Sequence, residues 1–458
     1  MSRLQLVAAG LVLLLAVGGA AVADGEIGPR AHGAGRPGVA PSGAWHCLHG
    51  GGAEGWEATL QVANPGAETA TIRVRTLGPR RPTGFETYTV EPGAFLQVPV
   101  PADDRARAST VEWCEQWVAV GWVAHGGGEE GGVAAEPCAP AAGERWLVPD
   151  GSTETEQQDD YVIVTNPFAR DAVFSVTLLS ERKSPVRRSD LTDVVLGPYR
   201  STAIRLNDVV LGERTVSTLV EASVGRVVSS MLGISRVGGI RAGLGYLGRP
   251  SQDLVVPGGA DAGRTELVVM STGPERIEIA GELLDAETDQ PFAGLADSAP
   301  RGESGRTFPA STEGPTSVTF RASAPGPAPA RRTYGVVSDQ GSTVGAVPAE
   351  AWVVMPAVSG EPSHPRLVLA NPGSTPAEIT LSYLSPGGAG PVVVTVPPRR
   401  TVSAPKAFVE AAPDVGVLAV ASSGTFVPAA ASYSRGREGF ATYAVALGVP
   451  VPGAWVPD

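Results

Sequence analysis

The sequence has few of the residues from which catalytic and metal sites are built. Of 458 residues, five are histidine, three are cysteine and 6% are aromatic. The nucleophile elbow G-x-S-x-G, the zinc helix H-E-x-x-H and the P-loop are all missing. We therefore expect a protein that is not an enzyme, with no catalytic residues, no cofactor and no metal. A catalytic pair of carboxylates is not excluded, because two such residues can be far apart in the sequence and adjacent in the fold.

Positive charge is also scarce. The chain has 35 lysines and arginines against 47 aspartates and glutamates, for a formal net charge of -12, and its sequence contains no basic cluster. Nucleic acids require a concentrated positive face. We therefore expect no nucleic-acid partner, and the acidic surface serves mainly to keep the protein soluble.

Glycine and proline, in contrast, are abundant, with 58 and 41 residues. Long helical periodicities are absent, while valine and threonine are frequent. Frequent glycine and proline, together with valine and threonine, are typical of an all-β chain with many turns.

One stretch recurs along the chain: an apolar run, an Asn-Pro pair, a short turn and an alternating strand. Proline ends the first strand, and the asparagine side chain can bond to the backbone of the turn. Apolar and polar residues then alternate with the period of a half-buried strand, as in Ile72 and Val74 beside Arg73. The copies are VANPGAETATIRV from residue 62, VTNPFARDAVFSV from 164, LANPGSTPAEITL from 369 and a drifted one, LVVMSTGPERIEIAG, from 267, in which Ser271 and Thr272 replace Asn-Pro.

The spacing of these copies predicts the architecture. Asn64 and Asn166 are 102 residues apart, and Asn371 lies 205 residues further on. A period near 100 residues is the usual size of a β-sandwich domain, so we expect four tandem immunoglobulin-like sandwiches. The alternative is a β-propeller in which each period makes two blades.

Turn signals place further elements. Pro92-Gly93 predicts a hairpin, and so does VEWCEQWVAVGW from residue 111. The second hairpin recurs as VEASVGRVV from 220, VVSDQGSTVGAV from 336 and AVASSGTFV from 419. The low-complexity stretches at 298–317 and 324–331 are predicted to be surface loops.

The order of the chain follows. Arg3, an uncharged run and Ala21-Val22-Ala23 predict a cleaved export signal. The uncharged run is also long enough for a retained membrane anchor. The predicted parts are a signal peptide or anchor at 1–23, a flexible tether at 24–44, and β-sandwich domains at 45–143, 146–250, 254–350 and 352–458.

Three cysteines in an exported chain suggest one disulfide and one free thiol. We favour Cys47 with Cys138, which joins the first and last strands of domain one. Cys114 with Cys138 is the alternative.

Domain one also holds the candidate ligand residues. Trp113 and Trp117, with Trp122, could present flat faces to sugar rings; the competing interpretation is core packing. His46, Cys47, His49, His125 and Cys138 match no regular zinc spacing. Outside this domain, Asp159 and Asp160 lack a calcium loop, and Gly243, Gly245 and Gly248 spell G-x-G-x-x-G but precede Arg-Pro, which favours a connector.

The order of opening tryptophan, Asn-Pro strand pair, proline-centred turn and V-x-A-S-x-G-x-V stretch is seen most fully in WLVPDGSTE, VTNPFARDAVFSV and VEASVGRVV. It resembles a domain-of-unknown-function family of exported actinobacterial proteins. The resemblance implies a secreted or envelope location and a repetitive β architecture, and it brings no catalytic residues.

We therefore expect an exported, extracytoplasmic, non-enzymatic structural or ligand-binding protein of the bacterial cell envelope. Its partner would be an unidentified envelope protein or a cell-wall polymer. The alternative is a carbohydrate-binding or hydrolytic envelope protein with its site in domain one.

Overall fold

The computed structural model describes residues 42–458 except 53–54, 81, 83, 128–130, 182–183, 237–238, 259–262, 274, 286–288, 292–303, 313–314, 335–339, 358–362, 386–389, 436–440 and 456–458. Residues 42–458 form one compact unit. The predicted signal or anchor and all of the tether before Ser42 lie outside the described residues. No helix among the described residues is long and apolar enough to cross a membrane.

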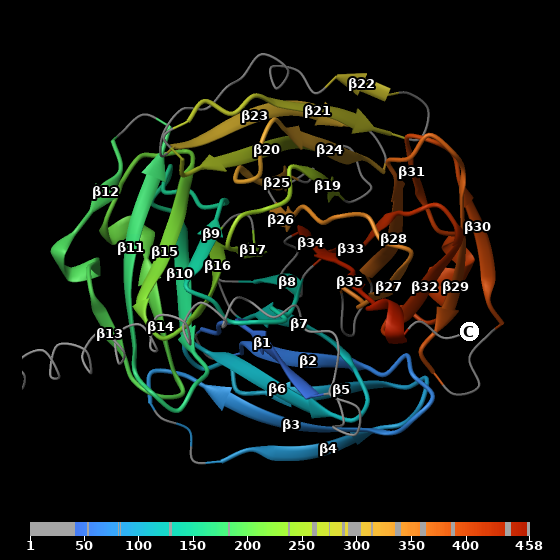
Figure 1. Cartoon of the computed structure of the whole chain (residues 1–458), viewed down its shortest axis with the longest axis horizontal. Helices are drawn as coiled ribbons and strands as arrows, with labels where there is room; N and C mark the ends of the chain where they lie inside the picture. Colours follow the sequence, from blue (N-terminus) through green and yellow to red (C-terminus); the bar gives the residue numbers. More distant parts are fainter. Residues whose placement is uncertain are drawn as a thin grey trace, which may run out of the picture. The chain divides into compact units, whose positions relative to one another are not determined.

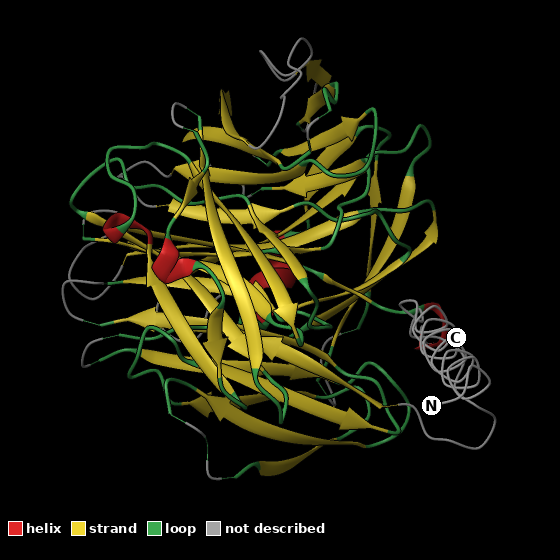
Figure 2. Cartoon of the chain, turned by 60° about the vertical axis from the view of Figure 1, so that its left-hand side comes forward, coloured by secondary structure: helices red, strands yellow, loops and turns green. Residues whose placement is uncertain are grey.

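The described chain is all-β, as predicted, and its sheets are antiparallel (Figure 2). Segment one contains β1 (Ser42–Cys47), β2 (Glu57–Ala63), β3 (Ala70–Leu77), β4 (Glu86–Val90), β5 (Phe95–Val100), β6 (Ala108–Cys114), β7 (Ala119–Gly126) and β8 (Gly132–Pro137). Segment two contains β9 (Arg145–Val148), β10 (Gln158–Asn166), β11 (Ala172–Ser180), β12 (Val186–Arg187), β13 (Val194–Leu196), β14 (Arg200–Arg205), β15 (Val216–Val224), β16 (Val228–Ser235), β17 (Gly239–Leu244) and β18 (Tyr246–Leu247).

The second half is built in the same way. Segment three contains β19 (Asp253–Pro257), β20 (Gly263–Ser271), β21 (Ile279–Leu284), β22 (Asp289–Pro291), β23 (Ser304–Thr312), β24 (Ser317–Ala322), β25 (Ala328–Tyr334) and β26 (Gln340–Val344). Segment four contains β27 (Ala351–Val354), β28 (Ser363–Asn371), β29 (Ala377–Tyr383), β30 (Val392–Val396), β31 (Arg400–Ser403), α2 (Lys406–Ala411), β32 (Val417–Ser423), β33 (Val427–Arg435), β34 (Ala441–Leu447) and β35 (Val449–Pro450). Short 3-10 turns lie at Ser189–Leu191, Leu206–Asp208 and Gly453–Trp455.

The same strand order recurs in all four segments. Segment one forms the sheets β1-β6-β3-β4 and β5-β2-β7-β8. The corresponding sheets are β9-β15-β11-β13 with β14-β10-β16-β17, then β19-β24-β21-β22 with β23-β20-β25-β26, and finally β27-β32-β29-β30 with β31-β28-β33-β34. β12 also pairs with β11, and the short strands β18 and β35 extend the sheets beside β9 and β27. The drifted copy was thus aligned correctly, because β20 of segment three takes the place of β2, β10 and β28.

The Asn-Pro turn joins the two sheets of each segment that has it. The strand before it ends at Ala63, Asn166 or Asn371, and the next strand lies in the other sheet. Each asparagine is buried, accepts a backbone N-H from two residues ahead and donates to a carbonyl four residues ahead. Its amide also donates to the end of the strand that precedes the proline-centred turn. The predicted bonding to nearby backbone is therefore confirmed.

Both predicted hairpins are wrong in form. β4 and β5 flank Pro92-Gly93 but belong to different sheets, and so do β6 and β7 around Glu115-Gln116. Each turn is therefore a crossover that closes one sheet over the other. Turn chemistry alone does not distinguish a crossover from a hairpin, because both need the chain to reverse.

Segment three requires two more corrections. The predicted loop 298–317 contains β23, and the predicted loop 324–331 contains the start of β25. β23 is an edge strand, where a proline such as Pro309 removes no interior hydrogen bond. The third predicted copy of the second hairpin, VVSDQGSTVGAV, is also at the wrong place. In segment three the connection that corresponds to the other three copies joins β24 to β25.

The sheets do not form propeller blades of consecutive strands. Every sheet interleaves strands from distant parts of its segment, as in β1-β6-β3-β4. The chain therefore does not take the alternative fold in which each period supplies two blades of successive strands.

The four segments contact one another in a closed cycle. β8 contacts β17 and β34, and β26 contacts the same two strands, so these four strands meet in the middle of the unit (Figure 1). One edge of each segment touches the segment before it, through the pairs Ser201–Gly78, Thr307–Thr215, Thr401–Asp285 and Gln97–Asp414. The last of these pairs joins segment four back to segment one.

The predicted ends of domains one to three, at 143, 250 and 350, lie in the connections from β8 to β9, from β18 to β19 and from β26 to β27. The predicted starts at 146, 254 and 352 each fall on the second residue of a strand, in β9, β19 and β27. β1 begins at Ser42, three residues before the predicted start of domain one. That each domain folds by itself stays a prediction.

Candidate functional site

The candidate tryptophans of segment one lie in or beside the core. Trp117 is 5% exposed and meets Trp45 edge to face, with 6.1 Å between ring centroids. Trp122 is also buried. Trp113 is half-buried and its ring lies against Gly43 of β1, where a Cβ would come within 2.7 Å of it. Trp117 is thus a core residue, and only Trp113 reaches the surface; ligand binding by Trp113 stays a prediction.

The predicted disulfide is present. Cys47 and Cys138 are bonded, with 4.5 Å between their Cα atoms, and both are buried. His46 and Ala139 exchange backbone hydrogen bonds beside it. The bridge therefore fastens β1 to the chain that follows β8, while Cys114 is free and exposed.

His46 and His49 of segment one are buried as neutral groups. Burial lowers the pKa of His46 to about 4 and that of His49 to about 4. His49 Nδ1 donates to Gly50 O at 2.8 Å, and Nε2 lies 3.1 Å from Ser109 Oγ. With both thiols in the disulfide, this region has no zinc ligand set, and no group of potential metal ligands occurs in the described part of the chain.

Segments two and three share a buried network of charges that sequence reasoning missed. Arg332 of β25 donates to Asp150 at 2.9 Å through Nε, and Arg241 of β17 donates to Asp160 at 2.5 Å. Arg241 also lies 3.7 Å from Asp150, and Arg332 lies 3.6 Å from Glu266 of β20. All five side chains are at most 3% exposed. Residues far apart in the sequence meet here, so no motif marks the network.

Electrostatics explains how this network is tolerated. Burial raises the pKa of the Asp150 carboxyl, but the charges of Arg332 and Arg241 outweigh it and hold that pKa below its usual value. A buried pair of this kind is worth little net stability, yet removing one partner is costly because the other charge is stranded. The network therefore fixes how segments two and three pack against each other. Because its side chains are buried, a substrate could not reach them.

A single carboxyl lies where the inner strands meet. Glu136 of β8 is 3% exposed, and the polar group that faces its carboxyl is the Leu244 backbone, which lowers the pKa less than burial raises it. Burial raises its pKa well above the usual value. The Glu136 carboxyl therefore holds its proton to a higher pH than an exposed glutamate does.

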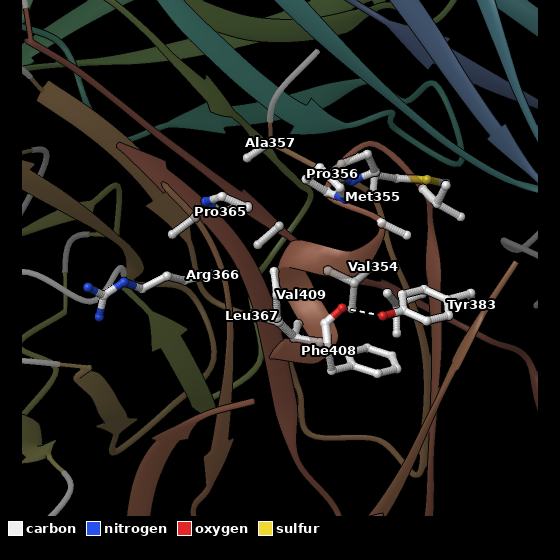
Figure 3. A pocket seen from close by; sticks show the side chains of 16 residues that line it. Val354, Met355, Pro356, Ala357, Pro365, Arg366, Leu367, Tyr383, Phe408 and Val409 are labelled. Atoms are coloured by element: carbon white, nitrogen blue, oxygen red, sulfur yellow. Dashed lines mark hydrogen bonds between the residues drawn. The ribbon is translucent and has the colours of Figure 1, made fainter. Parts of the chain in front are cut away.

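An apolar pocket lies beside α2 in segment four (Figure 3). Its space for the centres of water molecules is about 30 Å³, enough for one or two waters. Tyr383 closes one side, with its hydroxyl donating to Phe408 O and its ring stacked on Phe408 at 4.3 Å. Nearby lining groups are Val354, Met355, Pro365 and Val409. This pocket offers van der Waals contact and no acid, base or nucleophile apart from the tied Tyr383 hydroxyl.

The other sequence candidates have structural partners. Asp159 pairs with Arg205 at 2.5 Å, and Asp160 belongs to the buried network. Gly243 is the last residue but one of β17, and Gly245 links β17 to β18, where a Cβ on Gly245 would lie 2.9 Å from Ser229 O. The connector interpretation of this glycine motif fits that placement, since strands flank it on both sides.

Comparison with known proteins adds one match. A search of curated proteins found nothing similar to the chain. A family model covers residues 107–298, from the start of β6 to just beyond β22. The match therefore crosses the connections from segment one to two and from two to three. Over these residues the chain matches a family of unknown function, DUF5719, which confirms the resemblance to a domain-of-unknown-function family.

Proposed function

We propose that the protein is an exported, non-enzymatic scaffold of the bacterial cell envelope that binds a wall polymer or an envelope protein. In this proposal each segment is an immunoglobulin-like β-sandwich, and the four sandwiches act as one body. The bacterial envelope location comes from the family resemblance and the N-terminal sequence pattern.

The buried disulfide is the observation that carries the export. Disulfides form and persist in oxidising compartments outside the cytoplasm. Cys47 and Cys138 are enclosed in the core of segment one, where reductants have little access. A chain with the N-terminal pattern of an export signal would acquire this bond after leaving the cytoplasm.

The cycle of contacts between segments supports the scaffold part of the proposal. The buried charged groups between segments two and three are paired, as in Arg332 with Asp150, and serve packing. A rigid body of this kind presents outer sheet faces and loops in fixed positions. These surfaces, and not an enclosed cleft, would carry the binding.

Fractionation of the native host tests this proposal. We expect the mature chain to begin at Asp24 and to occur in the medium or wall fraction, with Cys47 resistant to thiol reagents until reduction. A chain that starts at Met1 in a membrane fraction supports the anchored form. A cytosolic chain with Cys47 reduced contradicts the proposal.

The second candidate function is carbohydrate binding or hydrolysis by segment one. The observation in its favour is Trp113, whose ring is partly accessible at the margin of the core. A glycan array with the wild type and Trp113→Ala tests it, with circular dichroism to show that the variant folds. Loss of a glycan signal in the variant supports this function, and equal signals contradict it.

A further inference from the structure

Several arginines occur where segment one meets segment two. Gly78, at the end of β3, forms a parallel bridge with Arg200, and the N-H of Ser201 donates to Gly78 O at 2.9 Å. The Arg107 guanidinium lies beside Gly78, within 2.7 Å of where a Cβ would be. We call Arg75, Arg80, Arg107 and Arg200 the junction arginines.

Two aromatic rings lie among these charges. The guanidinium carbon of Arg75 is 4.6 Å from the Tyr199 ring centroid and 5.8 Å from that of Phe85. Arg73 stacks on Phe85 at 5.0 Å, and half of the Phe85 side chain is exposed. Stacking holds the guanidinium planes in place, so their N-H groups are oriented before any ligand arrives.

The positive charge of this surface is only partly balanced. Arg107 pairs with Asp103 at 2.5 Å, and Arg73 pairs with Glu112 at 2.6 Å. For Arg75, Arg80 and Arg200, no carboxylate lies within ion-pair distance in the part of the chain that the structure describes. A local excess of positive charge on a chain of net charge -12 attracts anionic ligands to this place.

The equivalent contact between segments three and four shows what a balanced junction looks like. There Thr401 N-H donates to Asp285 O at 3.0 Å, as Ser201 does to Gly78. Arg399 has the positive φ that Tyr199 has, 54° against 55°, and it pairs with Glu282. The charge of Arg399 is thus neutralised by a carboxylate of the neighbouring segment. At the junction of segments one and two, Arg75, Arg80 and Arg200 have no such carboxylate among the described residues.

We propose that the junction arginines, with Phe85 and Tyr199, form a binding surface for an acidic polysaccharide whose sugars carry carboxylates. Guanidinium groups match carboxylates in bidentate geometry, and the exposed ring offers a flat face for the apolar side of a sugar. This inference rests on the proposed envelope function for the presence of such a polymer, but the binding itself can be measured on purified protein.

Polygalacturonate is the probe, with neutral dextran and polyglutamate as comparisons, and affinity is measured by calorimetry at 50 mM and 500 mM NaCl. We expect polygalacturonate to bind at low salt, to lose affinity at high salt through screening, and to exceed both comparisons. Arg75→Ala with Arg200→Ala should weaken binding about tenfold, since two oriented charge contacts are lost. Arg321→Ala, which removes an exposed, paired arginine in β24, should leave the affinity unchanged.

Arg80→Ala is the second variant, because Arg80 is exposed and outside any strand, so its removal does not disturb folding. We expect it to weaken binding by about a factor of three. The absence of polygalacturonate binding at 50 mM salt, equal binding of polyglutamate, or unchanged affinity in both junction variants would each overturn the proposal. None of these results bears on export, which the fractionation experiment tests separately.

Discussion

The buried asparagine of the Asn-Pro turn shows how one side chain fixes the approach of two sheets. Asn371 accepts from the N-H of Gly373 at 2.8 Å and donates to the carbonyls of Thr375, Val396 and Pro397 at 2.8 to 3.1 Å. It thereby ties the turn after β28 to the crossover after β30. In segment three Ser271 takes its place, and the Ser271 hydroxyl has no hydrogen-bond partner among the described residues.

Replacing Asn371 with alanine should lower the free energy of unfolding by about 2–4 kcal/mol, because buried carbonyls lose their donor. Urea denaturation of the wild type and the variant measures this change. Ser374→Ala, in the exposed part of the same turn, is the control and should have no effect. A change below about 0.5 kcal/mol for Asn371→Ala, the scale of ordinary surface substitutions, would contradict the interpretation.

Glu136 should make stability fall as pH rises. The folded-state pKa of Glu136 is raised above the unfolded value, so the folded chain holds a proton that the unfolded chain has released. The contribution is complete below pH 4.3, about the unfolded pKa, and is lost as pH rises through the folded pKa.

Glu136→Gln removes this dependence and should stabilise the protein relative to the wild type at pH 8 but not at pH 4. Urea denaturation at both pH values tests the prediction, with exposed Glu68→Gln as the control. Equal stability differences at the two pH values for Glu136→Gln would show that its carboxyl does not ionise on unfolding.

At the scale of elements, β1 depends on its covalent tie. The disulfide closes a loop of 91 residues between Cys47 and Cys138. By loop entropy, such a bridge contributes about 4–5 kcal/mol.

Cys47→Ala with Cys138→Ala should therefore lower the unfolding midpoint markedly, while Cys114→Ser should not change it. Thermal denaturation followed by circular dichroism compares the three proteins. An unchanged midpoint in the double variant would mean that packing of β1 alone holds segment one together.

The errors in element assignment have one physical cause. Alternating strands such as 72–75 were predicted correctly, because burial of one face leaves a period of two in the sequence. The partner of each strand leaves no such trace. β4 and β5 are separated by a short turn yet lie in different sheets, since pairing depends on the distant strands β3 and β2.

At the scale of the whole molecule, the buried charges join segments two and three. Arg332→Ala should destabilise the protein by about 3–5 kcal/mol, because Asp150 and Glu266 would stay buried with less compensating charge. Arg321→Ala, at an exposed ion pair with Asp253, should cost less than about 1 kcal/mol.

Urea denaturation with the two variants measures these differences. Limited proteolysis near residues 251–253 should also quicken in Arg332→Ala if the network holds the two segments together. If Arg332→Ala resisted proteolysis and urea as well as the wild type does, the contact between segments two and three would not depend on the network.

The sequence by itself determined the all-β character, the period near 100 residues, the turn asparagines and the favoured cysteine pair. Each of these leaves a local or periodic signal, because proline, glycine and alternating burial act on neighbouring residues. Only the tertiary structure decided the crossovers, the cycle of four segments, the buried position of Trp117, the Arg332–Asp150 network and the junction arginines. These features depend on contacts between residues far apart in the chain. Such contacts leave no pattern in any single stretch of the sequence.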